Sequence, residues 1–249
     1  MISFDLSGTT AVVTGARRGI GFAMASALAE AGADIIAGSS SQEPDGGAIG
    51  ARVRELGRGF EGHAVDLTDR DSVQRFADAA RHADILVNNA GTIRRAPAAE
   101  HPLDWWDEVL QVNLASQYVL TRTIGAGMLE RGHGRVIFTA SLLSFQGGIN
   151  VPGYAAAKSG VAGLVRALSN EWAGRGVTVN GIAPGYIATD NTEALRDDPE
   201  RSQAILDRIP AGRWGEADDL GGATVFLASP AAAYVTGTIL PVDGGWLAR

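Results

Sequence analysis

The chain has 249 residues, of which 45% are hydrophobic and 20% are charged, as in a soluble globular protein with room for one large α/β domain. Its net charge is −7 and no basic face is evident, which argues against a nucleic-acid partner or an anionic membrane surface. The absence of cysteine excludes a disulfide framework, a thiol nucleophile and a thiolate metal site.

Short β-branched runs alternate with helical patterns along the chain. Strands are predicted at 11–14, 34–37, 60–67, 84–87, 135–139, 177–180 and 239–242, and helices at 20–31, 43–57, 71–80, 102–130, 154–174, 193–208 and 216–228. This alternation is typical of βαβ units, and it predicts an α/β fold with a doubly wound parallel sheet of seven strands and helices on both faces. No linker-like stretch interrupts the pattern, so residues 1–249 are expected to form one domain.

A glycine-rich turn, Thr-Gly-Ala-Arg-Arg-Gly-Ile-Gly at 14–21, joins the first predicted strand to the first predicted helix. Glycines let the backbone approach a pyrophosphate, and the helix N-terminus that follows offers unpaired N–H groups. A plain tight turn is the alternative, but this position in a βαβ unit favours a nucleotide site. The predicted cofactor contacts in the turn are Gly15, Arg17, Arg18, Gly19, Ile20 and Gly21.

Tyr154 and Lys158 lie four residues apart in a predicted helix, so their side chains share one face. A free phenol has a pKa of about 10, and a nearby cation favours the phenolate. We therefore expect a lowered pKa for Tyr154 and a role for the pair in general acid/base catalysis. A surface pair on an ordinary helix is the alternative interpretation.

Further motifs follow the predicted strands: Asp-Leu at 66–67, Asn-Asn-Ala-Gly at 88–91, and Pro-Gly at 184–185. Together with the glycine spacing, they resemble the short-chain dehydrogenase/reductase family over nearly the whole chain. The resemblance implies a Rossmann-type, NAD(P)-dependent oxidoreductase with the catalytic tetrad Asn113, Ser141, Tyr154 and Lys158. It also implies cofactor contacts from Asp66, Leu67, Asn89, Ala90, Gly91, Tyr154, Lys158, Pro184, Gly185, Ile187 and Thr189, and a homotetrameric assembly.

By that resemblance, each member of the tetrad has a distinct role. Tyr154 relays a proton to or from the substrate oxygen, and Ser141 orients that oxygen. Lys158 lowers the phenol pKa and binds the nicotinamide ribose. Asn113 holds a water in a proton relay.

The cofactor choice depends on the end of the second strand, where Ser39, Ser40 and Ser41 stand in place of the carboxylate usual in NAD-preferring sites. Arg17 and Arg18 are expected to face these hydroxyls, although a solvated loop is the alternative for either arginine. Hydroxyl and guanidinium groups suit a 2′-phosphate, which favours NADP. NAD stays possible, because Glu43 is close enough in sequence to reach the ribose.

Segments 92–95, 143–148, 183–186, 205–215 and 242–249 closely resemble one subgroup of the family, the 2-dehydro-3-deoxy-D-gluconate 5-dehydrogenases, also called 2-deoxy-D-gluconate 3-dehydrogenases. These enzymes interconvert a secondary alcohol and a ketone of a deoxy sugar acid. The subgroup is generally associated with NAD, so the serines at 39–41 depart from its pattern.

A sugar acid needs a cation for its carboxylate, and a guanidinium binds a carboxylate through two parallel bonds. We expect Arg94 or Arg95 in this role, with Arg213 as a further candidate, unless these arginines make surface or subunit contacts. The other predicted substrate contacts are Ser141, Gln146, Tyr186 and Asn191. Trp214 and Trp246 either wall the pocket or pack in the core.

Two other functions stay open at this stage. A 3-oxoacyl carrier-protein reductase would share the tetrad, although the net charge does not suggest a basic surface for an acidic carrier. A non-catalytic nucleotide sensor would not need an intact tetrad. The opening segment, Met-Ile-Ser-Phe-Asp, has no signal-peptide pattern, so a cytoplasmic location without a membrane partner is expected. The four histidines form no ligand cluster in the sequence, and no metal site is expected.

Overall fold

The computed structural model describes residues 2–249, and Met1, at the start of the opening segment, lies outside the described residues. Seven strands form one sheet in the order β3-β2-β1-β4-β5-β6-β7, and every neighbouring pair is parallel. The predicted doubly wound sheet is confirmed. The strands are β1 Thr10–Thr14, β2 Asp34–Ser39, β3 Phe60–Ala64, β4 Ile85–Asn88, β5 Gly134–Thr139, β6 Val177–Pro184 and β7 Ile239–Val242.

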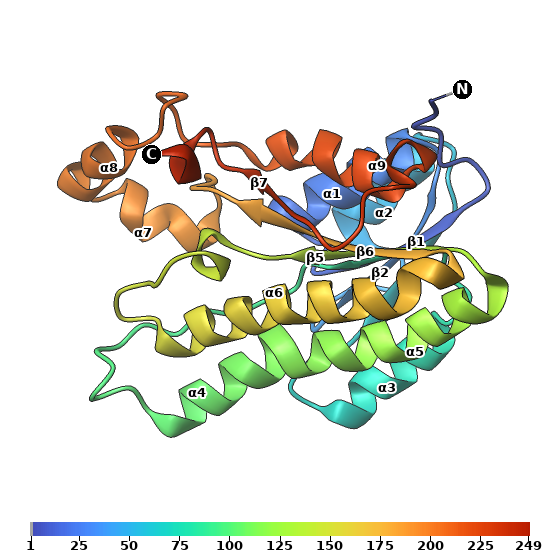
Figure 1. Ribbon diagram of the computed structural model, residues 1–249, viewed down its shortest axis with the longest axis horizontal. Coiled ribbons are helices and arrows are strands. Elements are labelled where there is room, and N and C mark those ends of the chain that lie inside the picture. Colours follow the sequence, from blue (N-terminus) through green and yellow to red (C-terminus); the bar gives the residue numbers. More distant parts are fainter. Residues whose placement is uncertain (1) are drawn as a thin grey trace.

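Helices cover both faces of the sheet (Figure 1). One layer contains α1 (Gly19–Glu30), α2 (Gly47–Glu55) and α9 (Gly221–Ala228), and the other contains α3 (Arg70–Ala79), α4 (Leu103–Leu110), α5 (Ser116–Arg131) and α6 (Pro152–Trp172). Neighbouring strand residues point to opposite layers: Val13 packs in the cluster with α1, and Val12 in the cluster with α3 and α5. Because both faces of the sheet are buried, the central strands have apolar residues at successive positions.

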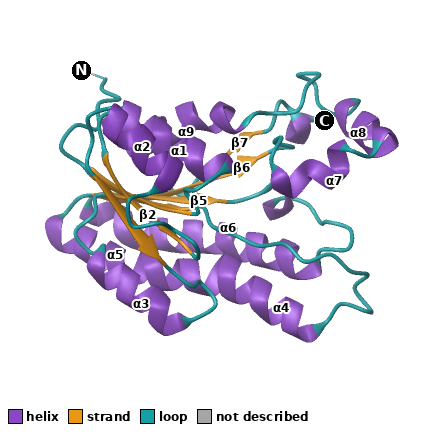
Figure 2. Ribbon diagram, turned by 180° about the vertical axis from the view of Figure 1, so that it is seen from behind, coloured by secondary structure: helices purple, strands orange, loops and turns teal. Residues whose placement is uncertain are grey.

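Two short helices, α7 (Glu193–Arg196) and α8 (Pro199–Leu206), project at one end of the molecule, past the end of β6 (Figures 1 and 2). A single helix was predicted over 193–208, and this was wrong. Asp198 accepts hydrogen bonds from the N–H groups of Glu200 and Arg201, and Pro199 occupies the first helical position. This N-cap starts a new helix and ends the old one.

The predicted helix over 102–130 is also interrupted, although its direction continues. A π-helical turn, Gln111–Ala115, separates α4 from α5. The Ser116 N–H bonds to Gln111 O, five residues back, and its hydroxyl donates to Val112 O at 2.7 Å. Such turns are rare and are frequent at functional sites.

Several other boundaries differ from the predicted ones. Helix α2 begins at Gly47 rather than at 43, because Gly46 turns the chain in the left-handed region with φ 86°. Strand β3 ends at Ala64, and β6 continues to Pro184.

The strand order places the reversal of the sheet between β1 and β4. The chain builds β1, β2 and β3 toward one edge and then returns to β4 on the other side of β1. Connections leave the carboxyl ends of β1 and β4 in opposite directions, which opens a crevice there. The glycine-rich turn and the Asn-Asn-Ala-Gly motif both begin at this crevice.

Candidate active site

The glycine-rich turn has no room for side chains where it meets β4. An added Cβ at Gly21 would lie 2.2 Å from Gly15 O and 2.4 Å from Asn89 Nδ2. At Gly19, with φ 54°, the nearest atom to an added Cβ would be Thr189 Cγ2 at 3.5 Å, so the turn faces the loop after β6. Ile20 packs against the core cluster beneath α1. The turn thus presents bare backbone at a helix N-terminus, the arrangement that a pyrophosphate requires.

The Asn-Asn-Ala-Gly motif joins three strands at the crevice. The N–H groups of Asn89 and Ala90 both donate to Thr14 Oγ1 at 3.0 Å, and Asn89 Nδ2 donates to Thr14 O at 2.9 Å. Asn89 Oδ1 accepts from Thr139 Oγ1 at 3.3 Å. These bonds fix the ends of β1, β4 and β5 relative to one another.

Arg17 lies at the end of β2, as predicted, but Arg18 does not. Arg17 donates to Ser41 Oγ and pairs with Glu43 at 3.2 Å. Arg18 instead bonds to Asp190 at 2.6 Å, across the crevice. Its backbone is extended (φ −157°, ψ 170°), and consecutive side chains of an extended segment point in opposite directions. Only one arginine is therefore available for the 2′ position.

The other predicted nucleotide contacts lie along the same edge of the sheet. Ser39 is half-buried and its hydroxyl lies 3.5 Å from Gln42 Oε1, while Ser40 is exposed. Asp66 accepts two bonds from Thr68, at 2.7 and 2.8 Å, and these bonds lower the pKa of the Asp66 carboxyl. The carbonyl of Leu67 accepts a weak bond from Gln111 at 3.5 Å.

Asn113 lies in the π-helical turn with its side chain fully buried. Its Oδ1 accepts from the Thr92 N–H at 2.8 Å, and its Nδ2 donates to Thr92 O at 2.7 Å. An added Cβ at Gly91 would lie 3.1 Å from Asn113 Oδ1. The amide therefore holds the loop after β4, next to the Asn-Asn-Ala-Gly motif.

The remaining three tetrad residues meet at the end of β5. Ser141 caps a 3-10 turn by accepting from the Leu143 N–H at 3.1 Å, and its hydroxyl bonds to Tyr154. Ser144 Oγ donates to the Lys158 carbonyl at 2.8 Å, which docks the start of α6 on this turn. Lys158 Nζ lies 5.6 Å from the centroid of the Tyr154 ring.

The electrostatics of the pair differ from the prediction. Burial raises the pKa of Tyr154, and this outweighs the lowering by the Ser141 hydrogen bond and by the charge of Arg95. The predicted net lowering of that pKa was therefore wrong. Lys158, the single lysine of the chain, donates to Thr139 O at 2.6 Å, and burial lowers its pKa to about 8.

The candidate substrate arginines have different environments. Arg94 makes a two-bond ion pair with Glu108, at 2.9 and 3.0 Å, and stacks over Trp105. Arg95 is exposed, its charge acts on Tyr154, and its Nη2 donates a weak bond to Asn191 O at 3.5 Å. Of the two, Arg95 is the one whose charge acts on the Tyr154 phenol.

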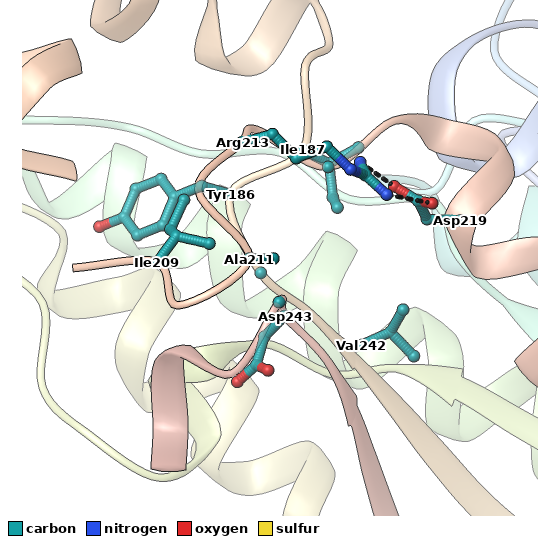
Figure 3. A pocket seen from close by; sticks show the side chains of 11 residues that line it. Tyr186, Ile187, Ile209, Ala211, Arg213, Asp219, Val242 and Asp243 are labelled. Carbon is teal, nitrogen blue, oxygen red and sulfur yellow. Dashed lines mark hydrogen bonds and ion pairs between the residues drawn. The ribbon is translucent and has the colours of Figure 1, made fainter. Parts of the chain in front are cut away.

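A cavity of about 220 Å³ lies beside the ends of β6 and β7, and none of the tetrad lines it (Figure 3). Arg213 at its wall bonds Asp219 at 2.7 and 2.9 Å, and this pairing lowers the pKa of Asp219 to about 2. Tyr186 contacts Trp214 edge-on and lies 4.7 Å from Trp246, ring centroid to centroid. Trp246 is buried in a core cluster, so the packing alternative is correct for it, whereas Trp214 is half-buried against the edge of Tyr186.

Backbone contacts order the segment after β6. The Gly185 N–H donates to Val242 O at 2.9 Å, and an added Cβ at Gly185 would lie 2.5 Å from Asp243 Cα. Ile187 is buried and bridges to Gly215, and the Thr189 N–H donates to Thr192 Oγ1 at 3.1 Å. Pro184 ends β6, Gln146 is half-buried after the 3-10 turn, and Asn191 is exposed beside Thr189.

Within residues 2–249, no three His, Cys, Asp or Glu side chains are placed to hold a metal ion together. No helix in that range combines the length and the apolar character needed to cross a membrane.

Comparison with known proteins identifies the family. The family model described as enoyl-(acyl carrier protein) reductase, of the short-chain dehydrogenase type, matches residues 15–247. A 2-dehydro-3-deoxy-D-gluconate 5-dehydrogenase from Pseudoalteromonas atlantica is 60% identical over 99% of this chain and 98% of its own. The chain belongs to the short-chain dehydrogenase/reductase family.

Two solved structures of this family are closely similar. One, assigned as an NAD(P)-dependent gluconate 5-dehydrogenase from Beutenbergia cavernae with bound NADP at low occupancy, is 51% identical with a TM-score of 0.95 and covers 99% of both chains. The other, a gluconate 5-dehydrogenase from Burkholderia cenocepacia with NADP and tartrate, is 37% identical with a TM-score of 0.94 and covers 100% of this chain and 98% of its own.

Sequence reasoning missed several residues that support this short-chain dehydrogenase site. Thr14 and Thr139 bind the Asn89 turn, and Thr92 binds the Asn113 amide. Gln117 Nε2 donates to Ala90 O at 3.1 Å, one helical turn after Asn113. Their position at strand ends and on the helix face of Asn113 was the signal that could have identified them.

Proposed function

We propose that this short-chain dehydrogenase/reductase interconverts a secondary alcohol and a ketone on a deoxy sugar acid, of the 2-deoxy-D-gluconate or 2-dehydro-3-deoxy-D-gluconate type, with NADP favoured over NAD. The environment of Arg95 is the main support for this substrate class. Among the arginines of segment 92–95 and Arg213, it is the one without an ion pair within residues 2–249, and its charge acts on Tyr154. The 60% identity to a sugar-acid dehydrogenase supports the same class.

The residues fit a nicotinamide cofactor. The bare backbone of the glycine-rich turn suits the pyrophosphate, and the segment Pro184, Gly185, Ile187 and Thr189 faces the turn from β6. A bound nicotinamide would supply the hydride chemistry. We propose that the Lys158 ammonium, which donates to Thr139 O, also binds ribose hydroxyls, and that Arg17 with Ser41 binds the 2′-phosphate.

The proton chemistry is proposed for Tyr154 and its neighbours. When an alcohol is oxidised, a bound nicotinamide would accept the hydride from its carbon, and the phenolate form of Tyr154 would take the proton from its oxygen. In the reverse direction the phenol returns that proton. Because burial raises its pKa, Tyr154 is a phenol at neutral pH and is ready to donate to a ketone. Ser141 holds the same oxygen, and Asn113 positions the adjoining loop.

Arg95, Gln146, Tyr186 and Asn191 are proposed to surround the substrate beyond the reacting carbon. The carboxylate would pair with Arg95, whose backbone neighbour Arg94 is fixed to Glu108 and so anchors the loop. Tyr186 contributes a half-buried aromatic wall beside Trp214. The Asn191 carbonyl already contacts Arg95.

A homotetramer, a cytoplasmic location and a single domain over residues 1–249 are proposed as well. In support of assembly, an apolar surface hollow lies between α5 and α6 and is lined by Leu114, Ala115, Tyr118, Gly160 and Leu164. Tyr118 there is 44% exposed and is contiguous with the other apolar residues of the hollow, and such a contiguous apolar surface is typical of a subunit contact. The absence of cysteine suits a reducing compartment.

A substrate screen tests the proposed function. Deoxy sugar acids, neutral sugars and 3-oxoacyl thioesters would each be assayed with NADP(H) and NAD(H). The highest kcat/KM is expected for a deoxy sugar acid with the NADP couple. Preference for acyl thioesters would favour a carrier-protein reductase, and binding of cofactor without turnover of any substrate would favour a nucleotide sensor.

Replacing Arg95 by alanine is expected to raise KM for a sugar acid by roughly 10- to 150-fold, because a charge-assisted bond to the carboxylate is lost. KM for a neutral sugar analogue should change little. Arg94→Ala is the comparison variant: it removes the ion pair with Glu108 that anchors the loop, so any effect it has should fall equally on both substrates. Steady-state kinetics on both substrates would check this. Equal effects of Arg95→Ala on both would contradict a carboxylate-binding role.

A further inference from the structure

The guanidinium of Arg17 is shared between a hydroxyl and a carboxylate at the end of β2. It donates to Ser41 Oγ, and its Nη2 lies 3.2 Å from Glu43 Oε1. The Arg17 and Glu43 side chains are 39% and 48% exposed, so a ligand can reach the pair. The Glu43 carboxylate therefore already pairs with the Arg17 guanidinium, the group best placed to bind a 2′-phosphate.

The Glu43 segment is held by its own backbone contacts. Its carbonyl accepts from the Gly46 N–H at 2.9 Å and from Gln42 Nε2 at 3.3 Å, and Gln42 is buried. An added Cβ at Gly47 would lie 3.1 Å from Glu43 Oε2, which places the carboxylate against the first residue of α2. The positive end of the α2 dipole favours an anion at that place.

We infer that Glu43 is a specificity-determining residue that weakens the preference for NADP by competing with the 2′-phosphate for Arg17. This inference rests on the cofactor choice in the proposed function. A 2′-phosphate that bonds to Arg17 and Ser41 must displace the Glu43 carboxylate from the guanidinium, and the loss of that ion pair offsets part of the new bond to the phosphate. NAD carries a neutral hydroxyl at the same place, so the Arg17–Glu43 pair stays intact when NAD binds.

The inference differs from the role that sequence alone left open for Glu43, which was to bond the ribose 2′-OH and favour NAD directly. In that case the carboxylate would point at the ribose and its loss would weaken NAD. In the structure its oxygen is directed to Arg17. The two roles predict opposite outcomes for NAD and can therefore be separated.

Binding of NADP⁺ and NAD⁺ would be titrated calorimetrically, without substrate, for the wild-type enzyme, Glu43→Gln, Arg17→Ala and the double variant. Glu43→Gln should tighten NADP⁺ by roughly 2- to 5-fold, the upper part of the range for one exposed charge interaction, and should change NAD⁺ by less than about twofold. In the Arg17→Ala background the gain should vanish. It should also shrink at high salt, because both groups are exposed.

Glu30→Gln is the matched control, because Glu30 is likewise a half-exposed carboxylate paired with an arginine, Arg52 at 2.6 Å, away from β2's carboxyl end. It should alter neither affinity. Weaker NAD⁺ binding by Glu43→Gln, unchanged NADP⁺ binding, or a gain that persists without Arg17 would overturn the inference. These titrations involve no sugar acid, so failure of the proposed substrate in the screen would leave their result standing.

Discussion

Replacing Tyr154 by phenylalanine should lower kcat by about 10²- to 10⁴-fold, the usual contribution of a positioned proton donor. The substitution removes the hydroxyl that is proposed to carry the proton beside Ser141 and keeps the ring next to Lys158. Cofactor affinity and folding should be retained. The measurement is kcat in both directions, together with an NADP⁺ titration and a thermal melt of the same preparation.

Tyr234→Phe serves as the control for that variant, since Tyr234 is fully exposed. It should leave kcat unchanged. If Tyr154→Phe retained wild-type kcat, the proton would have to come from another group, and the proposed mechanism would be wrong. If it lost NADP⁺ binding as well as turnover, the effect would be structural.

Replacing Lys158 by methionine should abolish most activity and at the same time stabilise the protein at neutral pH. Lys158 is 2% exposed, and burial lowers its pKa from 10.5 to about 8. At pH 7 the folded protein therefore carries a buried charge that costs about 3 kcal/mol relative to the neutral amine. Methionine has a similar length and no charge.

The gain should be smaller than that full cost, because Lys158→Met also leaves Thr139 O without its hydrogen bond. Loss of such a bond costs about 1 kcal/mol. A net gain of about 2 kcal/mol at pH 7 is expected, which corresponds to a rise in Tm of roughly 4–8 °C for a chain of this size. Enzymes commonly keep a functional group at a cost in folding stability.

The stability difference between Lys158→Met and the wild type depends on pH. Below pH 8, both the folded and the unfolded wild type bind the Lys158 proton, and the burial cost is fully present. Between about 8 and 10.5 only the unfolded chain binds it, so wild-type stability rises with pH through this window. The advantage of Lys158→Met over wild type should therefore be largest below pH 8 and shrink as the pH rises. Near pH 10.5 it should reverse to about 1 kcal/mol in favour of wild type, because only the lost hydrogen bond to Thr139 O then separates the two proteins.

Denaturant unfolding of both proteins across pH 7–10.5 would measure this difference, because all other titrating groups are common to the two. Since Lys158 is the single lysine, selective ¹³C labelling of lysine would report its pKa directly in the wild type. A pKa near 10.5, or a Met variant less stable at pH 7, would contradict the assigned burial cost. Arg166→Met, on the exposed side of the same helix, is a suitable control.

The sequence by itself determined the features that depend on local spacing. Alternating runs of β-branched and helical residues were sufficient for the order of strands and helices, because each element buries its faces with its own period. Gly21 and the Tyr154–Lys158 pair could be identified for the same reason. A tight turn and a shared helix face are set by residues a few positions apart. Resemblance to one family then connected these local features into a site.

The tertiary structure decided what depends on residues distant in the chain. Arg94 and Arg95 are adjacent and chemically identical, yet Glu108 engages only the first. Arg17 and Arg18 differ in the same way, because Asp190, the partner of Arg18, belongs to the distant segment that follows β6.

The direction of the Tyr154 pKa likewise depends on burial by packed elements rather than on the lysine four residues away. Spacing along one helix predicts which side chains are neighbours. It does not predict how far packing against other elements excludes water from those side chains. The balance between desolvation and charge is settled only when β5, the turn after it and α6 come together.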